Sequence, residues 1–113
     1  TATPPSNEIH KTALGAEDSV SWRYFKETMD AVTYLKQKGY VLCAVEQCEG
    51  SVMLNDFKRA AGKKYAVFMG NEVKGVQQSV IDACDICLEI PQYGTKHSMN
   101  VSVTAGIVMW ELL

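Results

Sequence analysis

The sequence contains no apolar run long enough to span a membrane, and no charged-then-apolar segment opens it as a secretion signal would. An excess of charge is also missing, because 11 Lys and Arg against 13 Asp and Glu give a net charge of −2. Such a chain is not a bulk polyanion binder, so any nucleic acid would have to be held by a local basic patch. Internal repeats, low-complexity tracts and an initiator Met are absent as well. From the missing Met we expect a processed, trimmed or partial chain.

Four cysteines are present, and their spacing allows more than one interpretation. Cys43 and Cys48 form one pair, while Cys84 and Cys87 form a C-x-x-C, so the two pairs could supply four thiolates to zinc. Cys43, however, lies inside an apolar run, and a free Cys often serves as a small buried hydrophobe. We therefore expect structural thiols and no metal, with zinc as the alternative and a disulfide ranked lower still. A reduced, cytoplasmic protein is the corresponding expectation.

Predicted strands and helices alternate along most of the 113 residues. Continuous apolar runs at residues 40–45, 65–69 and 87–90 predict strands that are buried on both faces. Helices are predicted from Thr28 to a stop at Gly39, at 77–83 and at 99–113. The alternation predicts one α/β domain with a mostly parallel sheet flanked by helices.

The remaining segments carry weaker signals. Residues 1–9 predict an arm, residues 10–16 a connector, and the aromatic stretch 21–25 a short strand at best. Residues 49–64 are polar and predict a loop with one helical turn.

The predicted C-terminal helix is apolar around its whole circumference. A helix without a polar face is normally buried on all sides. One face can pack on the sheet, and we expect a second copy of the chain to cover the other, which predicts a homodimer through this helix. Coverage by a segment outside this chain is the alternative.

Two loops with short side chains follow consecutive predicted strands. Residues 70–75 read GNEVKG, and residues 90–100 read IPQYGTKHSMN. Because the carboxyl ends of parallel strands meet at one edge of a sheet, these loops are expected to share a crevice, where α/β proteins bind ligands.

The same two loops resemble motifs of a known family. Residues 65–76, YAVFMGNEVKGV, resemble the second motif of the SpoU/TrmH family of RNA 2′-O-ribose methyltransferases, and residues 90–106 resemble its third. Weaker similarity runs back through residues 11–16. The resemblance implies the SPOUT class, an α/β fold with a C-terminal trefoil knot, which periodicity could not predict. It also implies S-adenosyl-L-methionine as the cofactor and RNA, either tRNA or rRNA, as the substrate.

Carried over by motif, the resemblance assigns roles to particular residues. The cofactor positions, which act largely through main-chain groups, fall at Val45, Gly70, Ile90, Gln92 and Met99. The catalytic or substrate-side positions fall at Glu72, Ser98 and Asn100. Glycine at position 70 suits a close backbone approach to a ligand. Ser98 also suits the N-cap of the final helix, so its role could be capping alone.

The first motif of the family, an Asn/Gly-rich segment ending in Arg, has no counterpart among the 113 residues. In the family that Arg is held to help activate the ribose 2′-hydroxyl, and Arg23 and Arg59 lack the motif context. We therefore expect residues 1–113 to be a SpoU-type methyltransferase domain without its first motif. The alternative is a non-catalytic RNA-binding or dimerisation module that keeps the fold.

Overall fold

A parallel four-stranded sheet forms the centre of the computed structural model, which describes residues 3–71, 73–91 and 100–113. Its strands are β1 (Val41–Val45), β2 (Val52–Met53), β3 (Tyr65–Met69) and β4 (Ile86–Glu89). Their order across the sheet is β2-β4-β1-β3, so β3 and β4 flank β1 on opposite sides. The pairing of β1 with β3 runs from Val41 opposite Tyr65 to Val45 opposite Met69. Because every pair is parallel, the carboxyl ends of β1, β3 and β4 meet at one edge.

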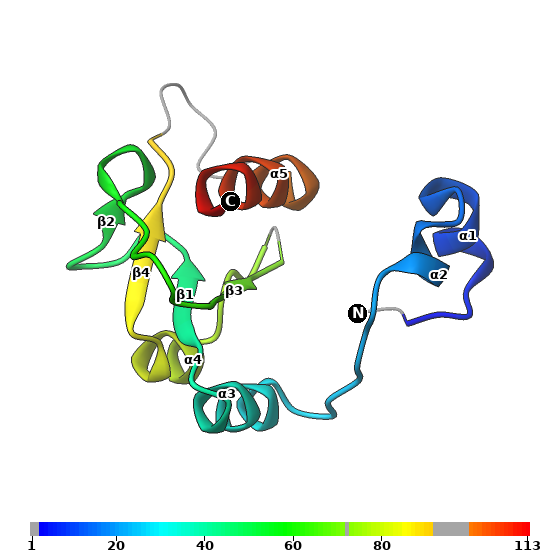
Figure 1. Ribbon diagram of the computed structural model, residues 1–113, viewed down its shortest axis with the longest axis horizontal. Helices are drawn as coiled ribbons and strands as arrows, with labels where there is room; N and C mark the ends of the chain where they lie inside the picture. Colours follow the sequence, from blue (N-terminus) through cyan, green and yellow to red (C-terminus); the bar gives the residue numbers. More distant parts are fainter. Residues whose placement is uncertain (1–2, 72, 92–99) are drawn as a thin grey trace.

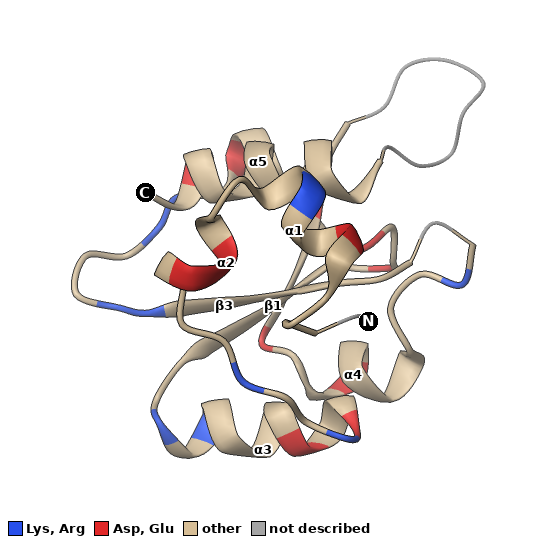
Figure 2. Cartoon of the chain, turned by 90° about the vertical axis from the view of Figure 1, so that its right-hand side faces the viewer, with Lys and Arg blue, Asp and Glu red and all other residues tan. Residues whose placement is uncertain are grey.

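Helices cover both faces of this sheet (Figures 1 and 2). They are α3 (Thr28–Gln37) and α4 (Gln78–Ala83) on one face and α5 (Val101–Leu112) on the other. Successive residues of a strand point to opposite faces, so β1 contributes to two cores. Leu42 packs with Val80 of α4, whereas Cys43 packs with Val108 of α5. The predicted α/β class with a mostly parallel sheet is confirmed.

The C-terminal helix begins two residues later than the sequence predicts. Asn100 is its N-cap, and the Asn100 side chain accepts a hydrogen bond of 2.8 Å from the Ser102 N–H. The predicted helix from Thr28 is confirmed, with Glu27 rather than Thr28 at the N-cap. In the predicted loop 49–64, the helical turn is the 3-10 segment η1 (Leu54–Asp56), and β2 precedes it.

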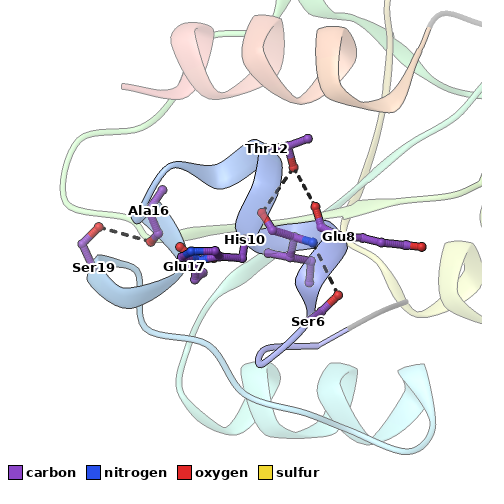
Figure 3. A network of polar contacts seen from close by, with 8 residues as sticks. Ser6, Glu8, His10, Thr12, Ala16, Glu17 and Ser19 are labelled. Carbon is purple, nitrogen blue, oxygen red and sulfur yellow. Dashed lines mark hydrogen bonds and ion pairs between the residues drawn. The ribbon is translucent and has the colours of Figure 1, made fainter.

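The N-terminal segments differ from the predicted arm, connector and strand. The helices α1 (Asn7–Ala13) and α2 (Ala16–Ser19) form there, and residues 21–25 contain no strand. Ser6 caps α1 by accepting the Ile9 N–H at 3.4 Å, and a His10–Glu17 contact of 3.2 Å joins the two helices (Figure 3). The sequence signal for this short helix is weak, because its capping residue Ser6 directly follows Pro4 and Pro5.

The cysteines pair differently from either sequence grouping. A disulfide joins Cys48, just after β1, to Cys87 of β4, 39 residues further along the chain. Our low ranking of a disulfide is therefore wrong for this pair, whereas Cys43 and Cys84 are free thiols. The neighbouring strands β1 and β4 bring the bonded residues together, which no local spacing could reveal. Within residues 3–71, 73–91 and 100–113, no three His, Cys, Asp or Glu side chains are grouped so that they could hold a metal ion.

None of the helices in the described part of the chain combines the length and the apolar character needed to cross a bilayer.

Candidate cofactor and substrate site

A cavity of about 480 Å³ opens at the carboxyl ends of β1, β3 and β4. Val45 of β1, Gly70 after β3 and Ile90 after β4 all line it. The volume lies within the range of small-molecule sites in proteins. The predicted shared crevice is therefore present, and strands on both sides of β1 contribute to it.

The turn after β3 forms one wall of the cavity and is stabilised by its own asparagine. The Asn71 side chain accepts hydrogen bonds from the N–H groups of Val73 at 3.0 Å and Lys74 at 2.5 Å. The Asn71 carbonyl accepts from Gly75 N–H at 3.0 Å, which closes the turn. An Asn that folds its backbone in this way fixes a turn without help from the core. This wall of the site is therefore shaped mainly by local backbone geometry.

Glu46, the first residue after β1, connects this turn to the sheet. One carboxylate oxygen accepts the Val76 N–H at 3.0 Å, and the other accepts the Gln47 N–H at 3.0 Å. The Glu46 N–H itself donates to the Leu88 carbonyl of β4 at 3.1 Å. One half-buried residue thus links the ends of all three strands around the cavity that it lines. Sequence reasoning missed Glu46, although a polar residue directly after a buried strand was an available signal.

The two glycines of the turn are required by close packing. A Cβ added at Gly70 would collide with the backbone of Gly75 and Val76. A Cβ at Gly75 would collide with the Glu46 carboxylate, and Gly75 also has a φ of +67°, which side chains disfavour. The close approach at Gly70 is therefore to the chain's own backbone. We expected it to be to the ligand.

The N-terminal end of α5 forms another part of the wall. Val101 and Thr104 line the cavity, and Asn100 caps the helix directly beside them. The side chain of Asn100 is exposed, but its oxygen is used by the Ser102 N–H. The capping role that we considered for Ser98 thus belongs to Asn100 in this structure.

The predicted site residues fall into two groups. Val45, Gly70 and Ile90 meet at the cavity, and Asn100 lies at the adjoining helix end. The other predicted residues, Glu72, Gln92, Ser98 and Met99, lie outside the described residues. Further lining residues that the sequence did not single out are Glu46, Cys48 and Glu89.

The free thiols are not activated nucleophiles. Burial, together with the nearby Cys84 and Asp85, raises the pKa of Cys43 to about 11. Burial and Asp85 also raise the pKa of Cys84, while Lys36 opposes that shift. A reactive cysteine needs a lowered pKa, so both thiols serve the core.

Comparison with known proteins identifies the family. The model of the SpoU rRNA Methylase family matches residues 1–110. The chain belongs to the SpoU rRNA methylase family. The resemblance seen in residues 65–76 and 90–106 is thereby confirmed over almost the whole chain.

Relatives of this SpoU family chain act on two kinds of RNA according to their names. It is 33% identical over 100 residues to a tRNA (guanosine(18)-2′-O)-methyltransferase of Borreliella burgdorferi, covering 88% of this chain and 45% of the relative. It is 29% identical over 104 residues to a 23S rRNA (guanosine-2′-O-)-methyltransferase of Ralstonia nicotianae, covering 91% and 40%. The chain thus spans less than half the length of these relatives.

Solved structures of the family share the fold. The TrmH/SpoU tRNA modifying enzyme of A. aeolicus superposes with a TM-score of 0.80 at 25% identity, covering 91% of this chain and 51% of that one. An AdoMet-bound rRNA methyltransferase from Sinorhizobium meliloti superposes with a TM-score of 0.88 at 24% identity, covering 99% and 42%. The second likeness establishes the fold alone.

Proposed function

We propose that this chain forms the S-adenosyl-L-methionine site of an RNA 2′-O-ribose methyltransferase that acts on tRNA or rRNA. The observation that carries the proposal is the convergence of Val45, Gly70 and Ile90 on one cavity. Each belongs to a different strand end, and each is a cofactor position by its resemblance to the family motifs. The names of the relatives support the same reaction on both classes of RNA.

The residues present suit such a ligand. Gly70, Lys74 and Gly75 of the turn line the cavity together with Glu46, and a wall of this kind can select a flat adenine by its shape. Gln92 and Met99 complete the proposed cofactor set. When bound, S-adenosyl-L-methionine supplies a methyl group on a positively charged sulfur.

The substrate side is proposed at the N-terminus of α5. Asn100 would orient the ribose there, with Ser98 beside it and Glu72 supporting the hydrogen bonds from the neighbouring loop. Holding the 2′-hydroxyl in line with the methyl group is the main contribution that such residues can make. Asn100 can do so while capping α5, because its side-chain NH₂ remains a donor when its oxygen accepts from Ser102.

Turnover is proposed to need more than residues 1–113. No match to the Arg-bearing first motif occurs in them, and a positioned group that removes a proton typically contributes about 10²–10⁴-fold. The second candidate function is a non-catalytic RNA-binding or dimerisation module. Residues 1–113 would have this function because they contain no match to the Arg-bearing first motif.

The C-terminal helix is proposed as a dimer interface and as part of a trefoil knot. Val108 is buried against the sheet, while Met109 and Trp110 are 61% and 78% exposed, so an apolar face of α5 is left uncovered by the described residues. A second α5 would cover it. Tracing residues 92–99 in a crystal structure of the dimer tests both the threading and the interface. A cytoplasmic location stays a prediction, and the Cys48–Cys87 disulfide argues against it because disulfides are rare in that compartment.

Two measurements test the proposed function. Calorimetry with S-adenosylhomocysteine should show one site per chain, and primer extension on tRNA and rRNA should map a 2′-O-methyl group made by the protein that includes the Arg-bearing motif. Asn100→Ala should lower the methylation rate more than the cofactor affinity, whereas Asn55→Ala, at an exposed position of η1 that does not line the cavity, should change neither. Absence of S-adenosylhomocysteine binding would overturn the cofactor assignment. Methylation by residues 1–113 alone would overturn the proposed need for the first motif.

A further inference from the structure

The segment between α2 and α3 displays two aromatic rings to solvent. Trp22 is 52% exposed and Tyr24 is 64% exposed. They are two positions apart in an irregular stretch that contains neither helix nor strand. Two exposed aromatic rings so close in the sequence form a candidate interaction site. We call residues 20–26 the aromatic–basic segment.

Arg23 lies between these two rings in the sequence and is held by stacking. Its guanidinium lies 4.5 Å from the centroid of the Tyr34 ring and 5.2 Å from that of the Phe25 ring. The Phe25 and Tyr34 rings are themselves 5.6 Å apart, so α3 anchors the segment. A stacked guanidinium loses little further entropy when it binds a phosphate.

The other end of the segment joins α2. The His10–Glu17 contact and the hydrogen bond from the Ser19 hydroxyl to the Ala16 carbonyl stabilise this short helix against α1 (Figure 3). The contacts of Arg23 and Phe25 with Tyr34 are therefore the ones that restrain the backbone carrying Trp22 and Tyr24. Pre-organised aromatic rings bind at a smaller entropic cost than mobile ones.

The charge of this region is opposite to that of the rest of the chain. Residues 21–38 contain four cations, Arg23, Lys26, Lys36 and Lys38, and two acids, Glu27 and Asp30, for a net charge of +2. The whole chain carries −2, so the remaining residues carry −4. Figure 2 shows the blue positions along the connection from α2 to α3 and at the far end of α3. This is the kind of local basic patch that an otherwise acidic RNA-binding protein requires.

We propose that the aromatic–basic segment binds single-stranded RNA, with bases stacked on Trp22 and Tyr24 and phosphates contacted by Arg23 and Lys26. Stacking on exposed rings requires unpaired bases, which favours a loop or strand over a duplex. This inference takes one point from the proposed function, namely that the RNA bound by the segment is the methylation substrate. The segment lies outside the residues that line the cavity, so it adds affinity for RNA without contacting the cofactor.

Tryptophan fluorescence tests the proposal directly. The chain has two tryptophans, so Trp110→Phe leaves Trp22 as the only emitter. Titration of this variant with a U12 oligoribonucleotide should quench the fluorescence, because a stacked base quenches an indole. Trp22→Ala in the wild-type background should raise the Kd for U12, measured by anisotropy of labelled RNA, by about 5- to 100-fold. Trp110→Phe, which keeps an aromatic ring on the exposed face of α5, should leave that Kd unchanged.

The outcomes separate this inference from the proposed function. If U12 causes no quenching, or if Trp22→Ala binds it as well as wild type does, the aromatic–basic segment is not an RNA site. If Trp22→Ala changes the sedimentation coefficient instead, the segment is a protein–protein contact and the inference falls. S-adenosylhomocysteine affinity measured on the same preparations reports on the cofactor site alone. If the wild-type protein does not bind S-adenosylhomocysteine, the proposed function is refuted. RNA binding that depends on Trp22 would still support the inference in that case.

Discussion

Glu46→Ala removes the link between the end of β1 and the turn that forms a wall of the cavity. Two backbone N–H groups, those of Val76 and Gln47, lose their carboxylate acceptor. A hydrogen bond to a charged group contributes about 1.5–3 kcal/mol. Glu46 is only half-buried, so solvent screens the pair and water can replace part of the loss. We therefore expect the free energy of unfolding to fall by about 2 kcal/mol in total.

The larger effect is expected on ligand binding. Without the carboxylate, the turn keeps its own Asn71 bonds and the packing of Val76 but loses its hydrogen bond to the end of β1, so it can move relative to that strand. A displacement of about 1 Å in a binding wall can cost on the order of 10²-fold. The affinity for S-adenosylhomocysteine, measured by calorimetry, should fall by about 10–100-fold, and urea unfolding should report the stability loss separately.

Two further variants distinguish the link from the charge. Glu46→Gln keeps one acceptor oxygen, and we expect its affinity to lie between those of wild type and Glu46→Ala. Glu89→Ala removes another carboxylate from the cavity, one that accepts a hydrogen bond of 2.7 Å from the Ser51 hydroxyl and none from the described residues of the turn, 70, 71 and 73–76. If Glu46→Ala and Glu89→Ala lose the same affinity, the cavity's charge matters and our reasoning about the link is refuted.

Three further predictions concern the core, the final helix and assembly. Burial raises the pKa of the Cys43 thiol from 9.0 to about 11, so the unfolded chain loses this proton at a lower pH than the folded protein does. The free energy of unfolding should therefore fall as the pH rises from 9.0 to about 11. Cys43→Ala should flatten that part of the pH profile measured by urea unfolding. Asn100→Ala removes the cap of α5 and should lower the unfolding free energy by about 0.5–2 kcal/mol, with Asn100→Asp retaining most of it. Met109→Glu places a charge on the exposed face of α5 and should shift the sedimentation equilibrium toward the monomer. A wild-type chain that is monomeric at high concentration would contradict the proposed dimer.

The sequence predicted the parts of this fold that depend on local patterns. Apolar runs at 40–45 and 65–69 became β1 and β3. Burial on both faces holds for the central strand β1, whereas the five residues of the edge strand β3 are only half-buried. The site was predictable to the same extent, since the motifs placed Gly70 and Ile90 at strand ends that share an edge. The short helix α1 was missed because a cap of one Ser beside two prolines gives a weak signal.

Contacts between distant residues were decided only by the tertiary structure. The Glu46 carboxylate meets Val76 thirty residues away, because β1 and β3 are paired in register. Cys48 meets Cys87 because β4 lies on the other side of β1. Likewise, the need for glycine at position 70 could be read as room for a ligand until the fold brought Gly75 against it. Such contacts depend on strand order and register, which the sequence near each contacting residue does not encode. The motifs could therefore place the wall of the site, but they could not identify the residues that support it.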